Sequence, residues 1–167
     1  MKALWVLLAT AAAVALQATV DRWLPLGTVD LVLVVVVYNA LASGRVAGLA
    51  TGSVAGLIQD ALSGGVIGMA GLSKCVVGFL AGIAGTQFIV AHAISRFVAF
   101  FLATVVNAVI FIGLYEVLGL RQFGTPFAAV AIQGLGNAVV GVVAFALRDM
   151  LPGAVERRRH MQTRLRR

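Results

Sequence analysis

Charged side chains are scarce in this sequence, and their scarcity excludes an ordinary water-soluble domain. Only 11% of the 167 residues are charged, against about 25% in soluble domains. Hydrophobic residues make up 61%, whereas soluble domains contain roughly 45–50% apolar residues. A soluble fold of this length could not bury so much apolar surface, so we expect the chain to be embedded in a membrane.

Groups that carry catalysis or bind metals are equally sparse. A single cysteine, Cys75, excludes a disulfide framework or a cysteine-based metal site within one chain. His92 and His160 have no acidic or cysteine neighbours at metal-ligand spacing, and Ser63 and Ser73 have no nearby histidine. No carboxylate pair suits general acid–base chemistry, and no glycine-rich stretch has the pattern of a phosphate-binding loop. The sequence therefore predicts no catalytic residue, no metal site, no cofactor and no enzyme.

Six apolar segments are present, separated by short polar or glycine-rich breaks. Each is close to the roughly 17–25 residues that cross the hydrocarbon core as a helix. The run Leu31–Val37 lacks the alternation of a barrel strand. We therefore predict an all-α integral membrane protein with a six-span domain at residues 1–147 and a basic tail at residues 148–167. The predicted spans are residues 3–20, 25–42, 46–62, 69–91, 96–118 and 125–147.

The basic residues predict the orientation of these spans. In a six-span arrangement Lys2, Arg45 and Arg96 share one side with the tail, and only Arg22 and Arg121 lie on the other. Because positive charge is retained on the cytoplasmic side, both termini are predicted to be cytoplasmic, in a multi-pass protein of the membrane.

The N-terminus has a second interpretation. Lys2, the apolar run after it and Ala13-Val-Ala15 are similar to a cleavable signal peptide. The apolar character continues to Val20, however, and removal of this segment would leave an odd number of spans. A first span is therefore favoured over a signal peptide.

Two opposite charges within the spans, Asp60 and Lys74, require an explanation, because an ionisable residue in a span costs about 2.5–3.5 kcal/mol on insertion scales. Small residues accompany both at four-residue spacing: Gly48, Gly52 and Gly56 before Asp60, and Gly78, Gly82 and Thr86 after Lys74. In an antiparallel hairpin closed by Gly64, Gly65 and Gly68, this spacing predicts close helix packing. The predicted facing pairs are Asp60 with Lys74, Gly56 with Gly78, Gly52 with Gly82, and Gly48 with Thr86.

The hypothesis is that Asp60 and Lys74 form an ion pair that fixes the hairpin. In the alternative interpretation both lie near the interface, with the Lys74 side chain extended toward the headgroups and Asp60 in water. A second polar set, Asn107 and Asn137, is predicted at similar depth in the last two spans. A hydrogen bond between these two amides and packing against separate partners are equally consistent with the sequence.

The tail carries seven of the thirteen basic residues. On the cytoplasmic side such clusters attract anionic lipids, and an acidic face of a cytoplasmic partner is the alternative ligand. Nucleic acid is not expected, because no aromatic residue interleaves the arginines. The predicted contact residues are Arg157, Arg158, Arg159, Arg164, Arg166 and Arg167.

The most distinctive run at the centre of the chain is Gly56-Leu-Ile-Gln-Asp60, Ala61-Leu-Ser-Gly64 and the following Gly68. With the residues around it, this run resembles the MreD family of bacterial rod shape-determining membrane proteins, and it is the most specific part of that resemblance. Family members commonly have proline before the aspartate of the second span, where this chain has Val29, and Pro25 lies four residues earlier. Further matching positions are Val29-Asp30-Leu31, Tyr38-Asn-Ala-Leu41, Gly48, Lys74 and Val77-Gly78-Phe79.

The resemblance implies a non-enzymatic scaffold of the cell-elongation machinery in the bacterial cytoplasmic (inner) membrane. It implies binding to MreC and work beside MreB, RodA and a class B penicillin-binding protein in organising peripheral peptidoglycan synthesis. It also implies a fold similar to the six-helix substrate-binding components of energy-coupling-factor transporters. The alternative function is therefore a vitamin-binding transporter component, and copurification of a vitamin rather than MreC distinguishes the two.

Overall fold

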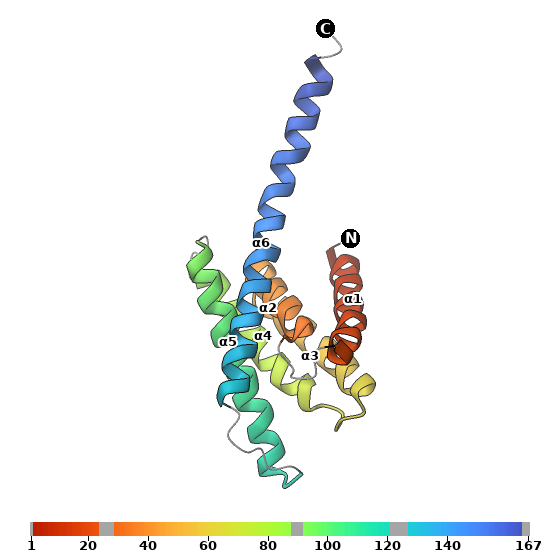
Figure 1. The fold of residues 1–167 in the computed structure, drawn as a ribbon, viewed down its shortest axis with the longest axis vertical. Helices are drawn as coiled ribbons and strands as arrows, with labels where there is room; N and C mark the ends of the chain where they lie inside the picture. The colour runs from red at the N-terminus through yellow and green to blue at the C-terminus, as the bar shows by residue number, and fades with distance from the viewer. Residues whose placement is uncertain (1, 24–28, 88–91, 121–126, 165–167) are drawn as a thin grey trace.

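The computed structural model describes residues 2–23, 29–87, 92–120 and 127–164, and these residues form six α-helices (Figure 1). No strand occurs within these four ranges. The helices are α1 (Lys2–Trp23), α2 (Leu31–Ser43), α3 (Arg45–Ser63), α4 (Met69–Gln87), α5 (Ala93–Val117) and α6 (Phe127–Arg164).

Each predicted span overlaps one of these helices, and two boundaries differ from the prediction by more than a few residues. A continuous helix from residue 25 is wrong, because Asp30 has an extended backbone with φ −108° and ψ 90° and caps a helix that begins at Leu31. At the other end, α6 does not stop near residue 147 but continues to Arg164. The division between a membrane domain and a tail at residue 148 therefore remains a prediction, and the backbone is helical across it.

Three of the described helices are long and apolar enough to cross a membrane: Met69–Gln87, Ala93–Val117 and Phe127–Met150. The other three differ for identifiable reasons. Helix α2 has 13 residues, a length of about 20 Å at 1.5 Å per residue. Helix α3 is rich in glycine, serine and threonine, which lowers its mean hydropathy, and the apolar part of α1 that can be described is Leu8–Gln17.

Helix α2 lies at the centre of the bundle and supplies more of the described buried hydrophobic residues than any other helix. Its valines Val32, Val36 and Val37 have no solvent exposure. Val37 belongs to a cluster with side chains from α4, α5 and α6, among them the buried Phe100. Val32 and Val36 belong to a second cluster with Val14 of α1 and Ala55 of α3. Other helices therefore cover most of the apolar surface of this short helix.

The helices run alternately up and down, so that basic residues gather at one end of the bundle. The Arg96 Nη1 atom of α5 lies 2.8 Å from Asp149 Oδ2 of α6. Arg45, at the start of α3, adjoins Gly82 near the end of α4. Figure 1 shows the N-terminus at this same end and α6 projecting beyond it. The loop that follows α3 and the C-terminal end of α5 lie at the opposite end.

Candidate functional site

The closest helix contact in the protein is the one between α3 and α4, where glycines remove the side chains that would separate the backbones. A methyl group at Gly48 would overlap the Gly78 carbonyl, one at Gly52 would overlap the Lys74 carbonyl, and one at Gly56 would overlap the Ala70 carbonyl. The two small-residue stripes therefore face each other, as close packing in lipid requires.

The register of this hairpin differs from the predicted one. Gly56 meets Ala70 instead of Gly78, a displacement of eight residues, or about two helical turns. In the same direction, Gly82 meets Arg45 instead of Gly52, and Thr86 lies beside Gly44 instead of Gly48. The Thr86 hydroxyl donates to carbonyls of its own helix. The predicted pairs of Gly52 with Gly82 and of Gly48 with Thr86 are wrong for this reason.

The loop after α3 explains the displacement. Gly64 has φ +66° and Gly68 has φ +104°, which side-chain-bearing residues rarely adopt, whereas Gly65 lies outside this region. The loop lets α4 begin beside the last turns of α3. The Asp60 carboxylate then accepts hydrogen bonds from the backbone N–H groups of Gly68 at 2.9 Å, Ala70 at 3.0 Å and Gly71 at 3.3 Å.

Asp60 is therefore the cap of α4. The first N–H groups of a helix have no partner within the helix, and the positive end of the helix dipole favours an anion there. Asp60 is 4% exposed, so these N–H groups supply the donors that water would otherwise give. Nothing about this role requires a lysine.

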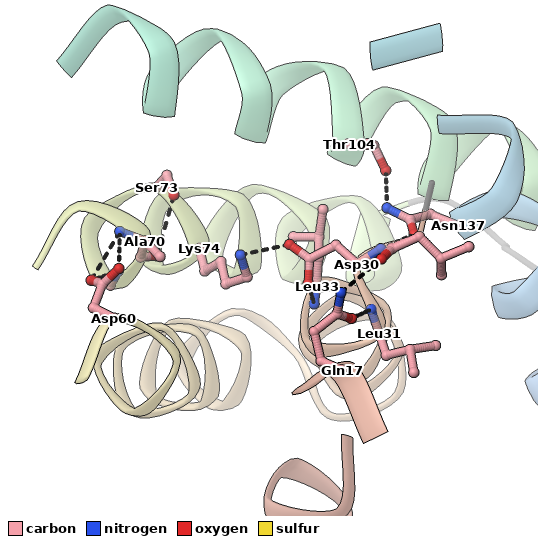
Figure 2. A network of polar contacts seen from close by, with 12 residues as sticks. Gln17, Asp30, Leu31, Leu33, Asp60, Ala70, Ser73, Lys74, Thr104 and Asn137 are labelled. Atoms are coloured by element: carbon pink, nitrogen blue, oxygen red, sulfur yellow. Dashed lines mark hydrogen bonds and ion pairs between the residues drawn. The ribbon is translucent and has the colours of Figure 1, made fainter. Parts of the chain in front are cut away.

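Lys74 has a different partner from the one predicted. Its ammonium lies 2.7 Å from Asp30 Oδ2, and the two side chains are 3% and 9% exposed. The predicted ion pair of Asp60 with Lys74 is wrong because the Lys74 backbone faces Gly52, about 12 Å along α3 from Asp60 at 1.5 Å per residue. Figure 2 shows the Lys74 side chain directed toward Asp30, away from the Asp60 cap.

Asp30 also organises the start of α2. Its Oδ1 atom accepts a hydrogen bond from the Leu33 N–H at 2.9 Å, as an N-cap does. Its own N–H donates to Asn137 Oδ1 at 2.8 Å. The neighbouring Leu31 N–H donates to Gln17 Oε1 at 2.8 Å, and Gln17 Nε2 donates to the Val29 carbonyl at 3.0 Å.

Asn137 extends this network to α5. Its Nδ2 donates to Thr104 Oγ1 at 3.0 Å, and the Thr104 hydroxyl donates to the Phe100 carbonyl at 2.9 Å. Of the two interpretations of the asparagines, separate partners is therefore the correct one for Asn137. Asn107, one turn further along α5, is buried and its Oδ1 atom has no hydrogen-bond partner in the described part of the chain.

The start of α2 thus joins α1, α4, α5 and α6 through buried polar contacts (Figure 2). We name the side chains that make them the Asp30 network: Gln17, Asp30, Lys74, Thr104 and Asn137. Sequence reasoning missed Gln17 and Thr104, which carry no charge to mark them. It paired Lys74 with Asp60 and did not consider Asp30 as its partner.

The remaining predicted site residues are the tail arginines. The side chains of Arg157, Arg158, Arg159 and Arg164 are outside the described structure, and Arg166 and Arg167 lie beyond its last residue. Among described residues, no group of three or more His, Cys, Asp or Glu is placed to hold a metal ion.

A bundle of apolar helices cross-linked by buried, mutually satisfied polar groups defines a helical membrane protein, and its interior contacts serve to hold the helices together. Comparison with protein-family models gives a match over residues 2–148 to the family described as rod shape-determining protein MreD. The chain therefore belongs to the MreD family, as its central motif had indicated. No curated protein and no solved structure matches it in the corresponding searches.

Membership gives the protein a role in the determination of rod shape and makes it a membrane protein. The family is one of structural, shape-determining proteins that function with the MreC and MreB machinery.

Proposed function

We propose that the protein is a non-enzymatic scaffold of the cell-elongation machinery that binds MreC and helps organise peripheral peptidoglycan synthesis. The observation that carries the proposal is the family match, because it extends over residues 2–148 and so includes all of α1 to α5 and most of the apolar part of α6. MreB, RodA and a class B penicillin-binding protein are the further partners in this proposal.

We also propose that all six helices cross the cytoplasmic (inner) membrane, in a layout similar to the substrate-binding components of energy-coupling-factor transporters. The short α2 is compatible with this arrangement because other helices cover most of its surface. The gathering of Arg45, Arg96 and the N-terminus at one end supports cytoplasmic termini.

The Asp30 network supports a scaffold role. A protein that holds a partner must keep its own helices in fixed positions, and here the start of the central helix is bound to four others. The outer surface of α5 is apolar by contrast, with Val98, Leu102 and Val109 all exposed. Such a surface suits lipid or the transmembrane helix of a partner, since helices in lipid associate through van der Waals packing.

The tail completes the proposal. Helix α6 continues as far as Arg164, so the basic residues after Arg148 begin on an extension of a membrane helix. On the cytoplasmic side these basic residues would bind anionic lipid headgroups or an acidic face of a partner. Binding to anionic lipids is worth about 1 kcal/mol for each basic residue near the surface.

Depletion of the protein in a rod-shaped host tests the function, and copurification tests the partner. We expect rounding on depletion, restoration of rods by the full chain, and recovery of MreC with the tagged protein. A truncated chain of residues 1–147 is the matched control and should still recover MreC if the helical body binds it. Unchanged cell shape after depletion, or the absence of MreC from the purified full chain, would contradict the proposal.

A further inference from the structure

A cavity of about 380 Å³ lies beside the Asp30 network, at the loop end of the bundle. Asp30, Lys74 and Asp60 line its polar side. Its apolar side is formed by α5 and α6, through Ala108, Phe111, Ile112 and Val130. The cavity is partly open to the outside of the bundle.

The three charged groups that line the cavity already have protein partners. Lys74 binds Asp30, and Asp60 accepts from the first N–H groups of α4. Two uncharged side chains that line the cavity each have an oxygen without a hydrogen-bond partner. The Gln59 Oε1 and Asn107 Oδ1 atoms are buried, line the same cavity, and have no hydrogen-bond donor within the described residues.

These two acceptors are unusual in an otherwise satisfied interior. Asn107 is only 7% exposed, and leaving a buried acceptor without a donor costs about 1–3 kcal/mol. The Asn137 amide, one helix away, has both of its polar atoms bonded. A hydrogen-bond donor placed in the cavity would satisfy both oxygens.

The charge of the side chains that line the cavity limits which kinds of hydrogen-bond donor can bind there. Two carboxylates and one ammonium leave one net negative charge around the cavity, which disfavours an anionic occupant. An apolar occupant would leave both amide oxygens unsatisfied. A primary ammonium has three N–H donors and a positive charge, and its hydrocarbon part would pack against Phe111 and Ile112.

We propose that this cavity binds the primary ammonium group of an amphiphilic amine, held by the amide oxygens of Gln59 and Asn107. Two sources present the same chemistry: the headgroup of an aminophospholipid, phosphatidylethanolamine, and a small soluble alkylamine. The inference is independent of which protein the scaffold binds.

Native mass spectrometry of the full chain, purified and exchanged into mixed micelles, tests the inference. The probes are phosphatidylethanolamine, phosphatidylcholine and dodecylamine. Phosphatidylcholine is the matched control lipid, because its quaternary ammonium has the same charge but no N–H donor. We expect at least a tenfold preference for phosphatidylethanolamine over phosphatidylcholine, and competition by dodecylamine. Binding of dodecylamine without retention of phosphatidylethanolamine would support the ammonium site and assign it to a soluble amine.

The variants Asn107→Leu and Gln59→Leu remove the acceptors at nearly constant volume and should reduce the preference to about twofold or less. Gln87→Leu, an exposed change at the far end of α4, is the matched control and should leave it unchanged. A thermal melt of each variant shows that it is folded. Equal retention of the two lipids together with no binding of dodecylamine would overturn the proposal. A preference unaffected by both leucine variants, or recovery of a vitamin in the cavity, would also overturn it.

Discussion

Lys74→Met tests the central assignment of the site, the buried ion pair with Asp30. The substitution keeps the length of the side chain but leaves the Asp30 carboxylate without its cation, at a position where the two side chains are only 3% and 9% exposed. Removal of one partner of a buried pair costs about 3–5 kcal/mol, because the remaining charge has no compensation. We expect a loss of this size in the free energy of unfolding, measured by steric trapping or by denaturation in mixed micelles.

The chain offers a matched control for this measurement. Arg96 and Asp149 form an ion pair at 2.8 Å, but the Asp149 side chain is 56% exposed. A pair with an exposed partner contributes about 0–1 kcal/mol, although the Arg96 side chain itself is 15% exposed. Arg96→Met also removes the contact of the guanidinium with the Phe145 ring, and it should still cost less than Lys74→Met.

A double-mutant cycle identifies the partner. Asp30→Asn keeps an N-cap acceptor for Leu33 but removes the negative charge, so the double variant with Lys74→Met should recover most of the loss. Asp60→Asn combined with Lys74→Met should show little coupling, because these side chains bind different groups. Equal costs for Lys74→Met and Arg96→Met, or stronger coupling through Asp60 than through Asp30, would refute the assignment.

Three further changes test the helix contacts, each measured by the same unfolding assay. Gly52→Ala should destabilise the protein by about 1–3 kcal/mol, since its methyl group would overlap the Lys74 carbonyl. Gly113→Ala, which has open space around it, should be neutral or stabilising by up to about 1 kcal/mol. Equal effects of the two changes would contradict the close packing of α3 against α4. Asp60→Ala should lower the free energy of unfolding by about 0.5–2 kcal/mol through loss of the helix cap, and Asp60→Asn should lower it less. Asp60→Ala should also speed hydrogen exchange at the first N–H groups of α4. Asn137→Leu should lower the free energy of unfolding by about 1–3 kcal/mol, because it leaves the Asp30 N–H without an acceptor. Val139→Ala changes an exposed position on the same helix and is the control. A loss for Asn137→Leu no larger than that of the control would argue against the Asp30 network.

The sequence was sufficient to predict what depends on local pattern. Apolar runs of adequate length located all six helices, and the glycine spacing located the contact between α3 and α4, because both follow from the geometry of a single helix. The cap at Asp30 was also predictable, since an aspartate before an apolar run is a common helix start.

The register of the hairpin and the partner of Lys74 were not predictable from the same pattern. A four-residue repeat of glycines is unchanged when one helix is displaced by two turns, so Gly56 can meet Gly78 or Ala70 with similar spacing. Only the path of the loop through Gly64 and Gly68 decides between these registers. In the register that this loop sets, Asp60 caps the start of α4, and Lys74 forms its ion pair with Asp30, the other buried carboxylate at that end.

The short central helix connects these observations. Helix α2 has 13 residues, about 20 Å, and a hydrocarbon core is about 30 Å thick, so in the proposed six-span arrangement one of its ends must lie inside the membrane. We propose that the buried start at Asp30 is that end. Backbone N–H groups there cannot be satisfied by lipid, which is why Gln17 and Asn137 reach them from neighbouring helices. The same recessed start leaves space between α3, α5 and α6 that no α2 residue fills, and the cavity lined by Asp30 and Asn107 occupies it. The network and the cavity therefore have one physical cause, the length of α2.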